Sequence, residues 1–82
     1  MIDFERKEHY GLSDLLRIVA LLRSEDGCPW DRVQTHASLR RSLLEEAYEA
    51  AEAIDRADPV LLKEELGDLL LQVVFHADIE RQ

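Results

Sequence analysis

The chain has 82 residues, which is enough for one small domain, and domains of this size often oligomerise because they bury only about 60% of their unfolded surface. Its formal net charge of -8 argues against nucleic acid or an anionic membrane as a partner. The single cysteine excludes an internal disulfide bond, and no apolar run reaches the roughly 20 residues of a membrane span, so a cytoplasmic location is expected. The composition, 46% apolar and 34% charged with only two prolines and three glycines, predicts an all-α fold.

The N-terminal region divides into a polar arm and a first helix. Residues 1–11 predict an arm in which His9 is exposed to solvent, and residues 12–82 are expected to form one helical domain. The first helix is predicted at about Asp14–Arg23, with Ser13 as its N-cap. Apolar residues recur along it at helical spacing, so this helix is expected to be structural.

Residues 24–32 predict the only real loop, because Gly27 and Pro29 interrupt regular structure. Trp30 offers a flat ring that either stacks on a nucleobase or plugs the end of the helical bundle, and composition slightly favours the plug. Cys28 is expected to be a buried small apolar residue, since no base lies beside it in the sequence.

Two longer helices are predicted in the rest of the chain. Thr35 or Ser38 can cap the first of them, which extends to about Arg56. Asp58 and Pro59 then form a helix-start signal, with aspartate as N-cap and proline at the first helical position. Helices joined by so short a turn usually pack antiparallel.

The helix that begins at Pro59 carries apolar residues around nearly its whole circumference. A helix of this kind is normally buried, and a chain of three helices has no obvious way to cover it. The sequence therefore predicts a helical bundle completed by dimerisation. Gly67 lies inside this helix at a cost of about 1 kcal/mol relative to alanine, and we expect it to let another helix approach closely.

Two short acidic patterns fall on these two helices. The first contains Glu45, Glu46 and Glu49, and the second contains Glu65 and Asp68. Residues three apart on a helix share a face, so the acids of both helices can converge on one spot. Carboxylates on a buried helix need partners, because burying an unpaired charge is costly.

Too few basic residues lie nearby to neutralise these acids. A divalent cation such as Mg²⁺ prefers carboxylate oxygens and would serve instead, although a pair of solvated acidic faces has the same spacing. Arg41 precedes the acids by one turn and is expected to support Glu45 at i,i+4 spacing, with a phosphate contact as the alternative. Trp30, Arg41 and Lys63 are the candidate substrate-binding residues.

Other metal centres fit the sequence less well. A ferritin-like di-iron site requires a glutamate three residues before a histidine, and none of the three histidines has one. A zinc site would use more cysteine or histidine, and the spacing of an EF-hand is absent. His76 continues the polar stripe of the last helix and is expected to be a satisfied core histidine.

Several motifs together resemble the N-terminal type of MazG domain over about residues 12–82. They are Gly-Cys-Pro-Trp-Asp at 27–31, Gln-Thr-His at 34–36, Leu-Glu-Glu-Ala-Tyr-Glu at 44–49 and the long run from Glu64 to Phe75. The resemblance implies an all-α bundle completed by dimerisation. It also implies Mg²⁺-dependent hydrolysis of nucleoside triphosphates to monophosphate and pyrophosphate, with Mn²⁺ as a possible substitute, as a house-cleaning activity on nucleotide pools.

Carried over by motif, the resemblance assigns roles to five acids. The metal ligands would be Glu46, Glu49, Glu65 and Asp68, and Glu45 would be a neighbouring acid that orients water or a ligand. The family's domain normally continues into another helix with basic residues that help to hold the phosphates, so this domain is expected to be either cut short at its C-terminus or a minimal member of the family. A non-catalytic or weakly active dimerisation module is the second hypothesis.

Overall fold

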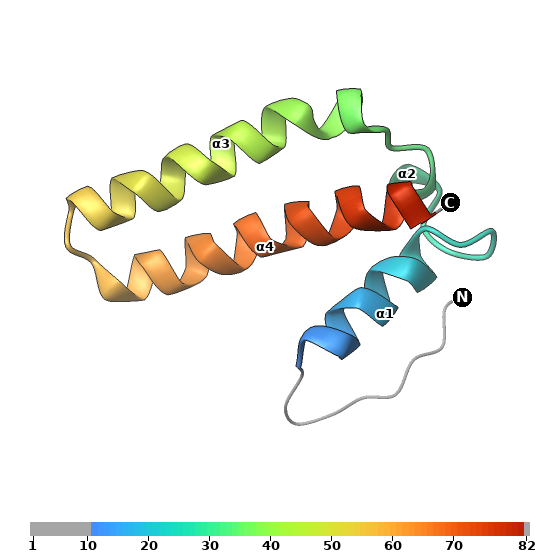
Figure 1. Ribbon diagram of the computed structural model, residues 1–82, viewed down its shortest axis with the longest axis horizontal. Coiled ribbons are helices and arrows are strands. Elements are labelled where there is room, and N and C mark those ends of the chain that lie inside the picture. Colours follow the sequence, from blue (N-terminus) through green and yellow to red (C-terminus); the bar gives the residue numbers. More distant parts are fainter. Residues whose placement is uncertain (1–10, 82) are drawn as a thin grey trace.

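The computed structural model describes residues 11–81, which form helices and no strands, so the predicted all-α class is confirmed (Figure 1). The helices are α1 (Leu12–Leu22), α2 (Pro29–Arg32), α3 (His36–Asp55) and α4 (Pro59–Arg81). The two long helices α3 and α4 lie side by side as an antiparallel hairpin, and α1 packs against α4 near its C-terminal end. Among the described helices, none combines the length and the apolar character that crossing a membrane requires. Apart from Gly11, the predicted N-terminal arm, including His9, lies outside the described residues.

Helix α1 begins two residues earlier than its sequence predicts. Gly11 is the N-cap, and its backbone N–H donates to the carboxylate of Asp14 at 2.9 Å. The prediction that Ser13 caps the helix is therefore wrong. An acidic side chain in the first turn can satisfy an unpaired backbone N–H from inside the helix, and its charge favours the positive helix end.

The segment predicted as a loop contains the short helix α2. Pro29 occupies its first position, where the missing N–H of proline costs nothing. Gly27 is needed just before it, because a Cβ atom there would clash with the backbone carbonyls of Leu21 and Leu22. Trp30 is 62% exposed, so it does not plug the bundle within the described chain, and the favoured interpretation of this residue is wrong. Cys28 is only half-buried.

The caps of α3 and α4 agree with the sequence. Thr35 caps α3, and its hydroxyl accepts a hydrogen bond from the Ser38 N–H at 3.1 Å. At the other end of α3, Ala57 adopts a left-handed conformation with φ 53°, which reverses the chain within one short turn. The carboxylate of Asp58 accepts from the Leu61 N–H at 3.0 Å, and Pro59 is the first residue of α4. The predicted start and end of α3 and the predicted start of α4 are therefore confirmed to within about one residue.

The core lies where α1, α3 and the C-terminal half of α4 meet. Its buried members are Val19, Leu39, Val74 and Phe75. Two buried alanines on α3, Ala50 and Ala53, mark where α3 is covered further toward the turn. A buried ion pair borders the core: Arg23 follows α1 and contacts Asp78 of α4, with its Nη1 atom 2.8 Å from the Oδ2 atom.

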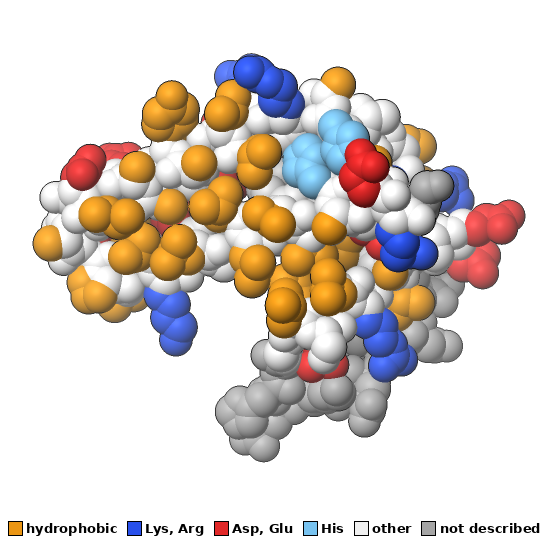
Figure 2. Space-filling model, in the orientation of Figure 1, with side chains coloured by type: hydrophobic (Ala, Val, Ile, Leu, Met, Phe, Trp, Pro, Cys, Tyr) orange, Lys and Arg blue, Asp and Glu red, His pale blue; other side chains and the backbone are white. Residues whose placement is uncertain are grey.

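Much of α4 remains exposed in the single chain, as expected for an apolar helix that three helices of one chain cannot cover. Leu66 is 48% exposed and Val73 is 52% exposed, and Figure 2 shows hydrophobic side chains spread over the visible face of the molecule. Gly67 also faces open space, since a Cβ atom there would meet no atom within 4 Å. No helix of the described chain approaches it, so the close approach predicted for Gly67 is absent within this chain.

Candidate metal centre

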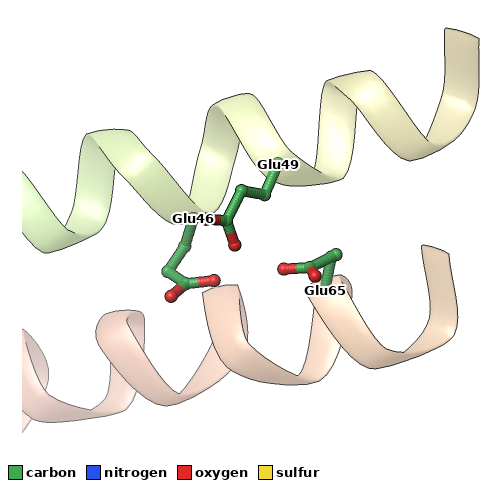
Figure 3. Close-up of side chains that lie close together, drawn as sticks. All are labelled: Glu46, Glu49 and Glu65. Carbon is green, nitrogen blue, oxygen red and sulfur yellow. The ribbon is translucent and has the colours of Figure 1, made fainter. Parts of the chain in front are cut away.

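Three carboxylates meet between α3 and α4. Glu46 and Glu49 extend from α3, one turn apart, and Glu65 extends toward them from α4 (Figure 3). One oxygen of each side chain lies within 4.8 Å of one oxygen of each of the others. The antiparallel hairpin explains this arrangement, because it brings one face of α3 opposite one face of α4. We call these three residues the acid cluster.

Two members of the acid cluster, Glu46 and Glu65, have raised pKa values. The pKa of Glu65 is raised to about 7, first by a hydrogen bond that it shares with Glu49, then by desolvation, and then by the negative charges of Glu49, Glu46 and Asp68. The pKa of Glu46 is also raised, mainly by burial and then by repulsion from Glu49 and Asp68. The hairpin thus holds together groups that repel each other when they are ionised.

The acid cluster lacks a positively charged partner within residues 11–81. No lysine or arginine of this region forms an ion pair with any of its three members. One carboxylate oxygen of Glu46 and one of Glu65 are buried without any hydrogen-bond partner there. Buried acceptors of this kind need a donor or a cation. A set of carboxylate oxygens fits a hard divalent cation such as Mg²⁺.

Two further acids predicted for the site have different positions. Asp68 is exposed and lies near enough to raise the pKa of both Glu46 and Glu65, but it is not one of the three closely grouped acids. Glu45 accepts a hydrogen bond from Arg41 at 2.9 Å on the surface of α3. The expected support between Arg41 and Glu45 is therefore confirmed, and Glu45 is not part of the acid cluster.

The predicted substrate-binding residues are dispersed. Arg41 is engaged with Glu45, and Lys63 is exposed on α4, about 200° around the helix axis from Glu65. Trp30 lies in α2, next to Asp31. The backbone carbonyl of Asp31 accepts a hydrogen bond from Arg23, and Arg23 also contacts Asp78, so α2 lies near the Asp78 end of α4. Asp78 follows Glu65 by 13 positions, which is roughly 20 Å along α4. Within one chain, Trp30 is thus remote from the acid cluster.

The structure also brings together polar residues that sequence reasoning did not connect. The rings of His36 and His76 are parallel with centroids 5.0 Å apart, and they meet edge to edge, because their Nδ1 atoms are only 2.7 Å apart. His76 is half-buried, and its Nε2 atom is buried without a partner among residues 11–81, so it is not the satisfied core histidine that was expected. The one sequence signal was the polar stripe of α4, which also contains Gln72, whose Oε1 atom is buried without a partner as well.

The fold and the acid cluster define an all-α protein that gathers carboxylates between two antiparallel helices. The MazG nucleotide pyrophosphohydrolase domain matches residues 34–82, which include α3, α4 and every member of the acid cluster. The chain therefore belongs to the MazG family, as its motifs predicted.

Several curated relatives are similar over most of this chain. The nucleoside triphosphate pyrophosphohydrolase/pyrophosphatase MazG of Thermotoga maritima is 58% identical over 69 residues, which cover 84% of this chain and 27% of the relative. The nucleoside triphosphate pyrophosphohydrolase of Escherichia coli K12 is 51% identical over 69 residues, or 83% of this chain and 26% of the relative. The protein of the same name from Mycobacterium tuberculosis is 49% identical over 77 residues, or 94% of this chain and 22% of the relative. The chain thus spans about a quarter of the length of these relatives.

Proposed function

We propose that this chain provides the metal-dependent centre of a nucleoside triphosphate pyrophosphohydrolase. The reaction is hydrolysis of a nucleoside triphosphate to the monophosphate and pyrophosphate, with Mg²⁺ or Mn²⁺ as cofactor, and it would serve to remove unwanted nucleotides from cytoplasmic pools. The observation that carries the proposal is the acid cluster, whose three carboxylates lie within 4.8 Å of one another and have no cationic partner among residues 11–81. The activity named for the relatives supports the choice of reaction.

The proposal assigns a separate role to each acidic residue of the site. Glu46, Glu49 and Glu65 hold the cation, and Asp68 adds negative charge at the exposed side of the site. When bound, the cation offsets the charge of the triphosphate and lowers the pKa of a bound water. Glu65, whose pKa is raised to about 7, loses its proton when the cation binds. Arg41 keeps Glu45 on the neighbouring surface.

We further propose that a second copy of the chain covers the exposed apolar surface of α4. Leu66, Leu70 and Val73 are between 43% and 52% exposed there, although Val74 and Phe75 of the same helix are buried in the core. Burying apolar surface contributes about 25 cal/mol per Å², so a second hairpin packed on α4 would stabilise both copies. Light scattering at micromolar concentration should therefore give a dimer or a multiple of a dimer, and a stable monomer would refute this part of the proposal.

The bond that is cleaved tests the proposed reaction. Nucleoside triphosphates are incubated with the chain and Mg²⁺ in ¹⁸O-labelled water, and the products are analysed by mass spectrometry. Attack of water on the α-phosphorus places the label in the monophosphate and releases unlabelled pyrophosphate. Formation of diphosphate and orthophosphate would instead indicate attack on the γ-phosphorus, and would refute the assignment.

A matched pair of variants links turnover to the acid cluster. Glu49→Gln removes one carboxylate of the cluster and should abolish both turnover and the rise in melting temperature that Mg²⁺ produces. Glu52→Gln changes a glutamate one turn away, whose partner is Arg56, and should leave both unchanged. Equal loss in the two variants would show that the effect comes from the surface charge of α3 rather than from the cluster.

An assembly module without turnover is the second candidate function. The exposed apolar surface of α4 favours it, because association requires such a surface and catalysis does not. Mg²⁺-dependent stabilisation and dimerisation without turnover of any nucleoside triphosphate would support this candidate. Turnover by a chain that is extended at its C-terminus would instead support the enzymatic function.

A further inference from the structure

A second group of metal-binding side chains lies at the other end of the α3–α4 hairpin from its turn. His36 is the first residue of α3, and His76 lies in the C-terminal part of α4. Their Nδ1 atoms are 2.7 Å apart, and the Nε2 atom of His36 is 2.8 Å from the Oε1 atom of Glu80. The histidines lie together at the surface beside a carboxylate (Figure 2).

The hydrogen bond to Glu80 decides how His36 can act. An ionised carboxylate only accepts hydrogen bonds, so the proton of a neutral His36 lies on Nε2 and its Nδ1 atom carries a lone pair. That lone pair faces the Nδ1 atom of His76 at hydrogen-bond distance, so the two nitrogens can share a proton as they stand, and can bind a cation only after they move apart. A carboxylate behind a histidine is also the usual outer shell of a histidine that binds a metal, because it orients the ring and makes the other nitrogen more basic.

We propose that His36 and His76 bind a divalent transition-metal ion of the Zn²⁺ class through their Nδ1 atoms, with Glu80 orienting His36. Zinc binds imidazole nitrogen at about 2.0–2.1 Å, so two tetrahedral ligands lie about 3.3 Å apart. The two Nδ1 atoms must separate by about 0.6 Å to reach that distance. The rings must also tilt so that both lone pairs point at one ion, because the two Nδ1 atoms now face each other directly. The His36 side chain is 45% exposed, so water can complete the coordination.

This site differs from the acid cluster in both position and ligand chemistry. His76 follows Glu65 by 11 positions, which is roughly 16 Å along α4. Imidazole nitrogen favours zinc, nickel and copper, whereas carboxylate oxygen favours magnesium and manganese. The ion would connect the start of α3 to the end of α4, positions that are 40 residues apart in sequence. The proposal therefore stands independently of the proposed enzymatic function.

Zinc titration of the Glu49→Gln variant tests the site, because the change weakens binding of the same ion to the acid cluster. Calorimetry should show one Zn²⁺ per chain, and saturating Zn²⁺ should raise the melting temperature by about 5 °C or more. Adding Glu80→Gln, which weakens the acceptor behind His36, should reduce Zn²⁺ affinity by about 10–100-fold. Adding His36→Ala, at an exposed helix terminus, should abolish the binding.

Two controls keep the result interpretable. His9→Ala removes the third histidine of the chain and should leave Zn²⁺ binding intact, whereas loss of binding in this variant would overturn the assignment to His36 and His76. His36→Gln replaces His36→Ala if circular dichroism shows that the alanine variant is unfolded. Absence of Zn²⁺ binding in Glu49→Gln, or binding unchanged by the loss of His36, would also overturn the proposal. His36→Ala made alone, with Glu49 intact, should keep the stabilisation by Mg²⁺. Failure of the histidine site is therefore distinguishable from failure of the acid cluster.

Discussion

Replacing Asp78 by asparagine should destabilise the chain more than any surface substitution. The Arg23 and Asp78 side chains are only 4% and 6% exposed, and their charged atoms are 2.8 Å apart. Without the carboxylate charge, the Arg23 guanidinium stays buried, and its one further acceptor among residues 11–81 is the backbone carbonyl of Asp31, at 3.3 Å. Removing one partner of a buried pair costs about 3–5 kcal/mol, because the remaining charge is left uncompensated.

This loss is large compared with the stability of so small a chain. Domains are stable by about 0.05–0.15 kcal/mol per residue, which gives roughly 4–12 kcal/mol here. At about 4–8 °C per kcal/mol, the melting temperature of Asp78→Asn should fall by about 12 °C or more. Urea denaturation followed by circular dichroism measures the change in the free energy of unfolding, and thermal scans measure the shift in melting temperature.

A surface ion pair provides the control for Asp78→Asn. Arg56 and Glu52 form an i,i+4 pair on α3 whose side chains are 64% and 59% exposed. Removing it with Arg56→Ala should cost at most about 0.5 kcal/mol, because water solvates the separated charges. A loss below about 1 kcal/mol in Asp78→Asn would refute the reasoning, since it would mean that the Arg23 charge is compensated in another way. Replacing Arg23 by methionine and Asp78 by leucine together should recover most of the stability, as no charge then remains buried.

Three further predictions concern α4 and the acid cluster. Gly67→Ala should raise the free energy of unfolding by about 1 kcal/mol in urea denaturation, because its Cβ atom meets nothing within 4 Å, and a decrease would indicate a helix packed there in solution. Leu70→Glu, at an exposed apolar position, should convert a dimer to monomer in light scattering while circular dichroism shows the helices retained. In metal-free buffer, Glu65 should lower stability as pH rises from about 4.5 through about 7, because the folded chain holds this proton more tightly than the unfolded chain. The stability that the Glu65 proton contributes is fully present below the unfolded pKa and is lost above the folded pKa. The free energy of unfolding should therefore fall more steeply with pH in this window for the native chain than for Glu65→Gln. Equal slopes would contradict the prediction.

Local signals in the sequence predicted the two long helices well. Thr35 provides a cap for α3, and Asp58 with Pro59 both caps α4 and sets its first dihedral angle, so each start depends on residues adjacent in sequence. The start of α1 was predicted two residues too late, because two kinds of cap compete there. Ser13 could cap the helix from outside, but Asp14 reaches back to the Gly11 N–H from inside.

Burial could not be predicted in the same way. The apolar pattern of α4 indicates that this helix requires a covering, but it does not distinguish another helix of the same chain from a second molecule. Val74 and Phe75 are buried by the chain itself, while Val73 between Gln72 and Val74 is 52% exposed. The exposure of Trp30 could not be predicted, because the four residues of α2 are too few to show a periodic pattern.

The acid cluster was predictable because its members are close in sequence on each helix and the turn between the helices is short. The 3-residue spacing places Glu46 and Glu49 on one face, and antiparallel pairing brings Glu65 opposite them. The exclusion of Asp68 from the closest group depends on side-chain geometry, which spacing does not specify. The histidine pair follows from the same register, since going back ten residues from Glu46 and forward eleven from Glu65 leads to His36 and His76. Sequence reasoning treated each histidine separately and did not use this register.

The arrangement along the hairpin explains how a repulsive cluster can persist in so small a fold. Ionised carboxylates at the centre of α3 and α4 favour separation of the two helices, as the raised pKa values of Glu46 and Glu65 indicate. The turn joins the helices at one end, where Asp58 caps α4 and the buried Ala53 ends the covered face of α3. At the other end, α4 is held to α3 by the contact between His36 and His76 and to the end of α1 by the buried ion pair of Asp78. Because both ends are fixed, the helices cannot relax by moving apart, and the unfavourable charge at the centre remains available for a cation to neutralise.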